Sequence, residues 1–299
     1  MMRIITRPDF DGVVCAVLLF EAENISAPVY WVEPNDMQRG LIDVQAGDII
    51  ANLPYHDNCS MWFDHHYTNR IDKPFDGVFK IAPSAARIIF DHYRQNFTRD
   101  YSGLIDATDK IDSADLTLDE VLRPERYDYV LLSMTVSNHD EPDEAYWNKL
   151  VELLRHRDIK AVLNDPDVQL RCRKVVADNE TYRALLEKHT RLVDHVAVSD
   201  FRSCDRAPVG NRFLVYSLFP EAYVHMRIRY DPRDKDKVVV NVGHSIFNTH
   251  CKVNVGLLLS KFGGGGHPGA GSCRFHVSNS DEYISRILDA LVRNEAVDN

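Results

Sequence analysis

Short apolar runs alternate with amphipathic segments through the first third of the chain. Residues 3–23 show a β-branched run, a turn and an apolar-faced segment, which together predict a strand, a turn and a helix. Further strands are expected within residues 28–34, 47–55 and 60–66, and a helix within 84–97, with Ser84 as its N-cap. Strands that alternate with helices favour a parallel sheet, and therefore an α/β fold.

The pattern changes twice in the rest of the chain. Residues 112–188 have helical spacing with charged faces. Four strands are expected after them, then a helix, a glycine-rich loop, a strand and a last helix. These lie within residues 195–201, 211–219, 222–230, 236–247, 253–262, 263–273, 274–277 and 280–295. The shift near residue 190 predicts two domains, a parallel-sheet domain at 1–190 and a smaller α/β domain at 191–299.

Composition narrows the class of protein. The 299 residues are 44% hydrophobic and 27% charged, so the chain has enough apolar residues for a sizeable core. The net charge of -10 argues against a protein that coats long DNA, because such proteins usually present a basic surface. A small anionic substrate remains compatible with this charge if a local cationic or metal-bearing site holds it.

The cysteines and the apolar runs indicate a cellular location. Six cysteines are spread over the chain without a CxxC pair, which is typical of reduced thiols rather than of a zinc knuckle or a redox motif. The first residues lack the apolar core of a signal peptide, and no apolar run reaches 18 residues. We therefore expect a cytoplasmic protein that does not enter a membrane.

Three polar clusters follow strands of the expected sheet: "RPDFDG" (7–12), "NLPYH" (52–56) and "DHH" (64–66). Ligands bind at the carboxyl ends of the strands in such sheets, so the three clusters are expected to lie together. Each alone has an ordinary explanation, namely a helix-capping turn or a solvated histidine pair. Together, carboxylate and imidazole groups suit manganese or iron better than a structural zinc site. Paired metal ions are a common device for cleaving phosphate esters.

Four stretches give the chain a specific resemblance. These are "TRPDFDG", "FDHH", "DKIDSAD" and, near the end, "GGGGHPGAG". They resemble the motifs of the DHH family of phosphoesterases and of the DHHA1 domain that follows the DHH domain. The family includes RecJ-type nucleases, nanoRNA and pAp phosphatases, cyclic dinucleotide phosphodiesterases and exopolyphosphatases. The resemblance implies one or two divalent ions, usually Mn²⁺ or else Mg²⁺, in a site beside a cleft between the two domains.

The resemblance also implies residue roles. Asp64 would orient the histidine pair, and His66 would lie beside the scissile phosphate. Asp112 is the preferred ligand within its acidic run, with Asp106 and Asp109 as alternatives. The implied metal ligands are Asp9 at the first ion, Asp11, His65 and Asp112 at the second, and Asn52 at the position that bridges the two.

Two positions depart from the family pattern. Arg7 stands where the family usually has histidine, and Asn52 where it usually has a bridging aspartate. Arginine cannot bind a metal because its guanidinium stays protonated. Our hypothesis is a one-metal or asymmetric site, in which Arg7 pairs with Asp9, replaces the first ion and grips a phosphate. The alternatives are that His56 supplies a substitute ligand, or that Arg7 makes an ordinary surface ion pair.

The glycine-rich stretch at 263–273 allows a close approach of the backbone to an anion, although a flexible linker would have a similar composition. The family resemblance implies that it holds the phosphate or terminal nucleotide of the substrate. An arginine that many relatives carry upstream is missing from "VGHSIFNTHCK", where Asn248 and Lys252 are candidate replacements. The expected substrate-binding residues are Gly264, Gly265, Gly266, His267, His244 and Ser245.

These observations favour a metal-dependent phosphoesterase that acts on a small anionic substrate. A short oligonucleotide, a pAp-like nucleotide, a cyclic dinucleotide and a polyphosphate all satisfy the expected site. The main alternative is a catalytically degenerate sensor of nucleotides or phosphate, which the changes at Arg7 and Asn52 motivate. An exonuclease of long DNA is disfavoured by the acidic charge. The sequence does not decide between a monomer and a homodimer.

Overall fold

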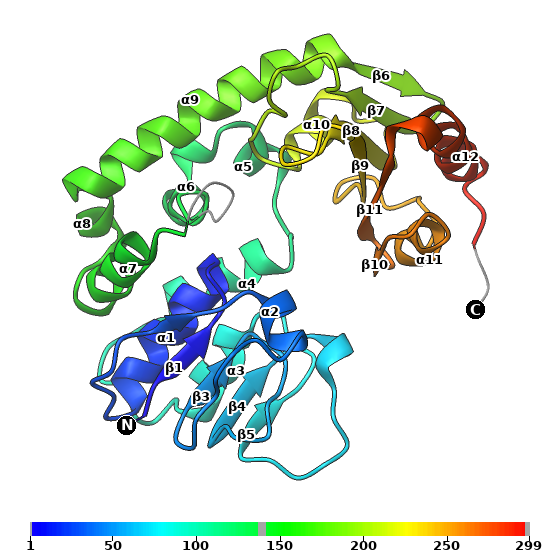
Figure 1. Ribbon diagram of the computed structural model, residues 1–299. Coiled ribbons are helices and arrows are strands. Elements are labelled where there is room, and N and C mark those ends of the chain that lie inside the picture. Colours follow the sequence, from blue (N-terminus) through cyan, green and yellow to red (C-terminus); the bar gives the residue numbers. More distant parts are fainter. Residues whose placement is uncertain (1, 137–141, 297–299) are drawn as a thin grey trace. The chain divides into compact units, whose positions relative to one another are not determined.

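The computed structural model describes residues 2–136 and 142–296 (Figure 1). The chain forms two compact units. The first contains the residues up to Leu116 and Pro124–Arg173, and the second contains Thr117–Arg123 and the residues from Lys174 onward. The division therefore falls within the long helix α9 (Pro166–His189). The domain boundary expected between residues 190 and 191 stays a prediction.

The first unit is built on a five-stranded sheet in which all strands are parallel. The buried strands β1 and β3 consist almost entirely of aliphatic residues, as expected for a parallel sheet covered on both faces. The carboxyl ends of all the strands lie at one edge. In spatial order the strands are β2 (Tyr30–Trp31), β1 (Ile4–Thr6), β3 (Ile49–Ala51), β4 (Met61–Asp64) and β5 (Gly77–Phe79).

Alternate residues of these strands supply two separate cores. Ile49 and Phe63 face a large cluster that includes most of helix α1 (Phe10–Ala22). Ile50 and Trp62 face a smaller cluster on the opposite side. Helix α1 packs against α3, α4 and α7, so a continuously apolar helix is covered on several sides. The other helical segments of this unit are α2 (Pro34–Gln38), η1 (Tyr67–Asn69), α3 (Ala85–His92), α4 (Ser102–Asp112), η2 (Pro124–Arg126), α6 (Asp128–Ser133), α7 (Glu144–His156) and α8 (Ile159–Leu163).

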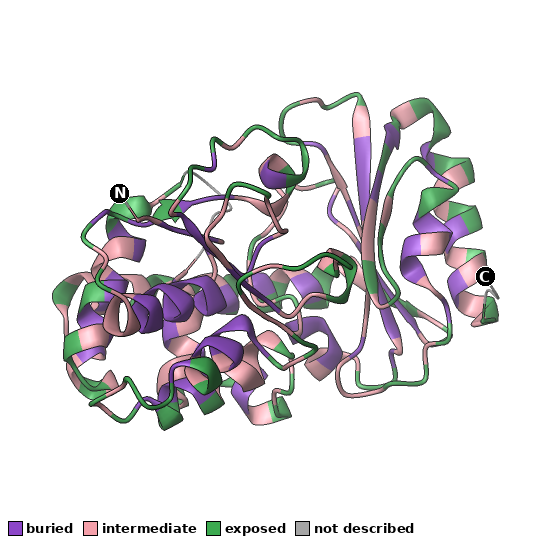
Figure 2. Ribbon diagram, turned by 90° about the horizontal axis from the view of Figure 1, so that it is seen from below, coloured by how far each residue is buried: buried purple, intermediate pink, exposed green. Residues whose placement is uncertain are grey.

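The second unit contains a six-stranded sheet that is antiparallel except for the pair β7 and β8. One face of this sheet packs on α11 (Val255–Ser260) and α12 (Ser280–Arg293). Figure 2 shows buried and exposed positions mixed along α12, the helix that leads to the C-terminus, as expected for an amphipathic helix on a sheet. The strand order is β10 (Gly265–His267), β11 (Ala270–His276), β9 (Lys237–His244), β8 (Val224–Tyr230), β7 (Val196–Asp200) and β6 (Thr190–Val193).

The α/β fold class is confirmed, but two local predictions are wrong. Residues 211–219 were expected to form a strand, and they contain helix α10 (Leu214–Leu218) instead. The side chain of Asn211 accepts a hydrogen bond from the backbone N–H of Phe213, which starts the helical turn. A short apolar run has no periodicity that separates a buried strand from a buried helix. Helix α5 (Leu118–Leu122) belongs to the same unit and packs on α10.

The second error concerns residues 263–273, where a loop was expected. They form the β10–β11 hairpin, with Pro268 and Gly269 between the strands. Glycine is required there for close backbone packing. A Cβ atom on Gly264 would lie 2.2 Å from the Ser272 carbonyl oxygen, and Gly266 has a φ of +147°. The glycines therefore have a structural role in the hairpin in addition to any role in binding.

Two general properties bear on the expected location. All six cysteines are free thiols. Among the helices formed by the described residues, none combines the length and the hydropathy needed to cross a bilayer.

Candidate metal centre

Three of the predicted ligands converge at the carboxyl edge of the parallel sheet. Asp11 lies in the first turn of α1, His65 follows β4 directly, and Asp112 is the last residue of α4. The Nε2 atom of His65 lies 3.9 Å from Asp11 Oδ2 and 3.4 Å from Asp112 Oδ2. One ligand atom from each residue lies within 4.8 Å of the other two, a separation that one metal ion can bridge.

The hydrogen bonds of His65 determine which nitrogen faces the carboxylates. Its Nδ1 lies 3.0 Å from the carbonyl oxygen of Ala82, and it must donate because a carbonyl only accepts. In the neutral ring, Nε2 then carries a lone pair. This atom is buried, and within residues 2–136 and 142–296 it has no hydrogen-bond partner. A lone pair that faces two carboxylates is repelled unless a cation lies between them, so these residues fit a divalent metal ion.

Asp11 is held by the beginning of helix α3. Its two carboxylate oxygens accept hydrogen bonds from the backbone N–H groups of Ala85 and Ala86, at 3.0 and 2.9 Å. The N-terminus of a helix stabilises negative charge there. Burial nevertheless raises the pKa of Asp11 above its ordinary value, against the opposing effects of His65 and the two backbone groups. A bound cation would offset this desolvation cost.

The structure distinguishes the three aspartates of the acidic run. Arg87 donates to Asp109 at 2.7 Å and to Asp106 at 2.6 Å. Asp109 also accepts from the Ser84 hydroxyl at 2.6 Å. Asp112 is therefore the member of this run that groups with His65 among the described residues.

Asp64 and His66 form a hydrogen-bonded pair next to this group. His66 Nδ1 donates to Asp64 at 2.8 Å, and Asn69 Nδ2 donates to the other carboxylate oxygen at 2.7 Å. Burial alone would lower the pKa of His66, but the hydrogen bond and the charge of Asp64 raise it above its ordinary value. The positioning role of Asn69 was missed from the sequence, where its only signal is its place three residues after the histidine pair.

Arg7, Asp9 and Asn52 form a cluster in which the guanidinium of Arg7 supplies a positive charge. Arg7 Nε lies 3.1 Å from Asp9 Oδ2, and Asp9 Oδ1 accepts from Asn52 Nδ2 at 3.0 Å and from the Gly12 N–H at 2.8 Å. Both carboxylate oxygens of Asp9 are thus already engaged. Burial raises the pKa of Asp9 to about 6, with the charge of Arg7 opposing the rise.

The structure brings only some of the predicted metal ligands together. Among the described residues, two groups of acidic and imidazole side chains are close enough to share an ion, one formed by Asp11, His65 and Asp112 and the other by residues 64–66. Asp9 belongs to neither group. Asn52 has a left-handed φ of +58°, and its buried Oδ1 has no partner. His56 also belongs to neither group, and its Nδ1 accepts from the Asn58 N–H at 3.2 Å.

The substrate-binding residues expected in the second unit gather around the end of β9. The backbone N–H of His244 donates to the carbonyl of Gly269 at 2.8 Å, which places His244 beside the turn of the β10–β11 hairpin. His244 Nε2 donates to the Val253 carbonyl at 3.0 Å, and burial lowers the pKa of its ring. Ser245 is buried, and its hydroxyl accepts from two backbone N–H groups of the following turn. His267 is exposed in β10, and Gly265 has open space where a Cβ atom would lie.

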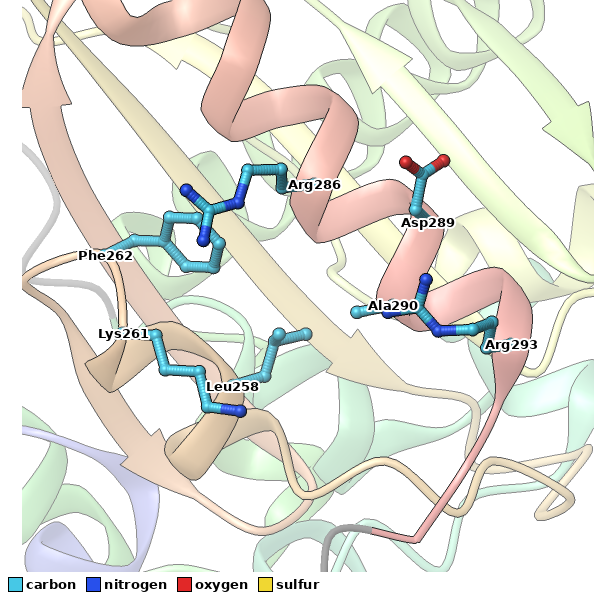
Figure 3. A pocket seen from close by; sticks show the side chains of 7 residues that line it. All are labelled: Leu258, Lys261, Phe262, Arg286, Asp289, Ala290 and Arg293. Atoms are coloured by element: carbon cyan, nitrogen blue, oxygen red, sulfur yellow. The ribbon is translucent and has the colours of Figure 1, made fainter.

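The second unit also has a shallow cavity of about 220 Å³ between α11 and α12 (Figure 3). The Arg286 guanidinium lies over the Phe262 ring, 5.3 Å from its centroid, and pairs with Glu282 at 3.0 Å. The cavity includes none of the predicted site residues. Its lining residues are Leu258, Lys261, Phe262, Arg286, Asp289, Ala290 and Arg293.

Comparison with solved structures identifies the fold and the family. The chain is similar to a pGpG-specific phosphodiesterase, PggH of Vibrio cholerae, with 30% identity and a TM-score of 0.85 over 99% of this chain and 100% of that one. It also shares its fold with an exopolyphosphatase-related protein from Bacteroides fragilis, at 10% identity and a TM-score of 0.56 over 96% of this chain and 91% of that one. An exonuclease RecJ bound to manganese gives 13% identity and a TM-score of 0.54 over 98% and 90% of the two chains. No family model and no curated protein sequence matches the chain.

The parallel sheet with acidic and imidazole side chains at its carboxyl edge, followed by a mixed-sheet unit, is the architecture of a metal-dependent phosphohydrolase. The chain belongs to the DHH family of phosphoesterases. The prediction of a metal-dependent phosphoesterase that acts on an anionic substrate is confirmed.

Proposed function

We propose that the chain hydrolyses the internal phosphodiester of a short linear dinucleotide with a 5′-phosphate, for which pGpG is the reference substrate. The products would be two molecules of GMP for each pGpG and water consumed. The observation that carries this proposal is the similarity to the pGpG-specific phosphodiesterase over the full length of both chains at 30% identity. Among the substrate classes that the sequence left open, a short linear dinucleotide therefore has the most direct support.

The proposed site uses one divalent ion, Mn²⁺ or Mg²⁺. Asp11, His65 and Asp112 would hold it, because their atoms converge and the buried Nε2 of His65 has no other partner. When bound, such an ion supplies Lewis-acid chemistry: it polarises the phosphoryl group and activates water. A second ion beside Asp9 is disfavoured, because Arg7 and Asn52 already engage both oxygens of that carboxylate.

The remaining residues have roles that follow from their contacts. Arg7 has a partly exposed side chain (39%) and a fork of N–H donors beyond the one facing Asp9, so it would bind a phosphoryl oxygen. His66 donates Nδ1–H to Asp64, so its Nε2 is the nitrogen that would exchange a proton with the reacting phosphate or its leaving oxygen. The raised pKa of His66 favours the protonated form at the start of this step.

The second unit would bind the part of the substrate away from the scissile bond. The hairpin residues and the end of β9 offer backbone N–H groups and neutral side chains rather than a cluster of cations. A neutral His244 suits contact with a nucleoside, since the pKa of its ring is lowered. The residues proposed for this contact are Gly264, Gly265, Gly266, His267, His244 and Ser245.

The test is a substrate panel with Mn²⁺. Purified protein is incubated with pGpG, cyclic di-GMP, pAp and polyphosphate, and the products are separated by chromatography. We expect pGpG to give GMP at the highest kcat/KM, with loss of activity in Asp11→Asn. Asp57→Asn is the matched control, because this carboxylate is 75% exposed and pairs only with Lys73 in the described contacts. Faster cleavage of the cyclic dinucleotide, pAp or polyphosphate than of pGpG would refute the proposed substrate.

Long DNA is not a proposed substrate, and the net charge of -10 supports that choice. A homodimer stays a prediction that sedimentation would test.

A further inference from the structure

Two large hydrophobic side chains beside the metal centre are unusually exposed. Tyr67 is 75% exposed and Ile81 is 67% exposed, the two highest values for large hydrophobic side chains in the described part of the chain. Tyr67 follows His66 directly and starts the short helix η1. Ile81 precedes Ala82, whose carbonyl fixes the orientation of His65.

The backbone brings the segments that carry these two side chains to the same edge of the sheet. Strands β4 and β5 are parallel neighbours with Asp64 opposite Phe79, and the Lys80 N–H donates to the Asp64 carbonyl at 3.4 Å. The segments that follow β4 and β5 therefore leave the same edge of the sheet side by side. Both side chains lie within two residues of the hydrogen bond that joins His65 to Ala82. The two residues therefore adjoin, along the chain, the hydrogen bond that orients His65.

Other aromatic residues of this unit pack against one another, in contrast to Tyr67. The ring of Trp62 packs against those of Tyr55, Phe75 and Phe79, with centroids 5.0 to 5.4 Å from its own. In the part of the chain that the structure describes, the ring of Tyr67 has no aromatic or cationic partner. Leaving an aromatic ring in water forgoes the free energy of burial, which stacking on a ligand would recover.

A protein surface is a poor candidate for that partner. A stable interface buries on the order of 800 Å² on each partner, far more than two side chains supply. The residues around them, Thr68, Arg70 and Lys80, are exposed and polar. A flat apolar surface next to a phosphate-cleaving centre instead matches the face of a nucleobase, because the base lies one sugar away from the scissile phosphate.

We propose that Tyr67 stacks on the nucleobase adjacent to the scissile phosphate and that Ile81 contacts the edge of that base. This inference rests on the proposed nucleotide substrate and makes Tyr67 a specificity-determining residue. It separates nucleotides from inorganic polyphosphate, which has no base to stack.

The test compares Tyr67→Ala, Tyr67→Phe and the control Leu170→Ala, which removes another exposed side chain (61%) on α9. For Tyr67→Ala we expect KM for pGpG to rise about ten- to a hundredfold while kcat stays within a fewfold, as the loss of a stacked base predicts. Tyr67→Phe keeps the stacking face and should stay within about threefold of the unmodified protein. Leu170→Ala should change neither constant.

A second readout separates this inference from the proposed function. Calorimetry measures GMP binding to the Mn²⁺-loaded protein, and Tyr67→Ala should weaken it by the same factor with Mn²⁺ affinity unchanged. If the protein binds GMP through Tyr67 but does not cleave pGpG, the proposed reaction fails and the stacking role stands. The stacking role is overturned if KM and GMP affinity stay within twofold in Tyr67→Ala. It is equally overturned if Tyr67→Phe loses as much as Tyr67→Ala, or if Tyr67→Ala dissociates an oligomer.

Discussion

The two halves of the candidate site differ in how their charge is balanced. Around His65, two carboxylates face a buried imidazole nitrogen that has no hydrogen-bond partner. Around Asp9, one carboxylate meets the guanidinium of Arg7 and the amide of Asn52, and both of its oxygens are engaged. The first half is therefore proposed to bind a cation from solution, whereas the second already contains the guanidinium of Arg7.

On the proposed function, the difference would let a metal site lose an ion without losing its charge. An arginine near a carboxylate provides a fixed positive charge that needs no metal and still leaves N–H donors for a phosphate. A metal ion can also activate water, which a guanidinium cannot do. We therefore assign the water-activating role to the half around His65 and the phosphate-binding role to the half around Asp9.

The largest effect is expected from Asp11→Asn. Removing this buried charge leaves His65 and Asp112 as an incomplete ligand set, so Mn²⁺ binding should be lost and kcat/KM for pGpG should fall by about a thousandfold or more. Calorimetry and steady-state kinetics measure the two effects. The amide oxygen can accept from only one of the backbone N–H groups of Ala85 and Ala86, so circular dichroism is the control that the variant is folded. Mn²⁺ binding that survives in Asp11→Asn would place the ion elsewhere.

A smaller loss is expected from Arg7→Ala. The phosphate would lose a charged donor, so kcat/KM should fall by about a hundredfold, while the number of bound Mn²⁺ ions stays the same. Arg70→Ala is the matched control, since Arg70 is 66% exposed and lies 3.8 Å from Asp72. Loss of Mn²⁺ together with activity in Arg7→Ala would mean that the two halves do not act separately.

The smallest effect is a pH-dependent loss of stability caused by a buried histidine away from the candidate metal centre. His225 in the second unit faces the Ser199 hydroxyl at 2.8 Å, and burial, aided by the charge of Arg227, lowers its pKa to about 3. The unfolded chain would protonate it near pH 6.5, so stability should fall as the pH drops below that value. We expect a loss of about 2 kcal/mol between pH 6.5 and 5, at most 1.4 kcal/mol per pH unit.

Urea unfolding at the two pH values measures this loss, and His225→Gln serves as the comparison. The glutamine variant should show a smaller dependence on pH because it has no titratable group at this position. An equal dependence in both proteins would show that other groups cause it.

The positions of the strand-end clusters could be predicted from sequence because each follows a short buried strand. Once the strands are parallel, residues 7–12, 52–56 and 64–66 must meet at one edge of the sheet. The N-cap role of Ser84 was also readable from its place before an apolar helix.

The choices within each cluster depended on tertiary contacts. The sequence favoured Asp112 but left Asp106 and Asp109 open, and the structure separates them because Arg87 of α3 engages both alternatives. The hydrogen bond between Asn52 and Asp9 joins residues from different strand ends, and local spacing carries no information about it. The same limit explains why helix α10 and the β10–β11 hairpin were predicted wrongly. Their sequences lack a clear period, so packing decides their conformation.

The most direct test of the account is the number of Mn²⁺ ions bound by the metal-stripped protein. Calorimetric titration with elemental analysis should give one ion per chain. The double variant Arg7→His with Asn52→Asp restores a ligand and a carboxylate in the half around Asp9, and it should bind two. Two ions in the unmodified chain would contradict the assignment of Arg7 as the replacement for an ion.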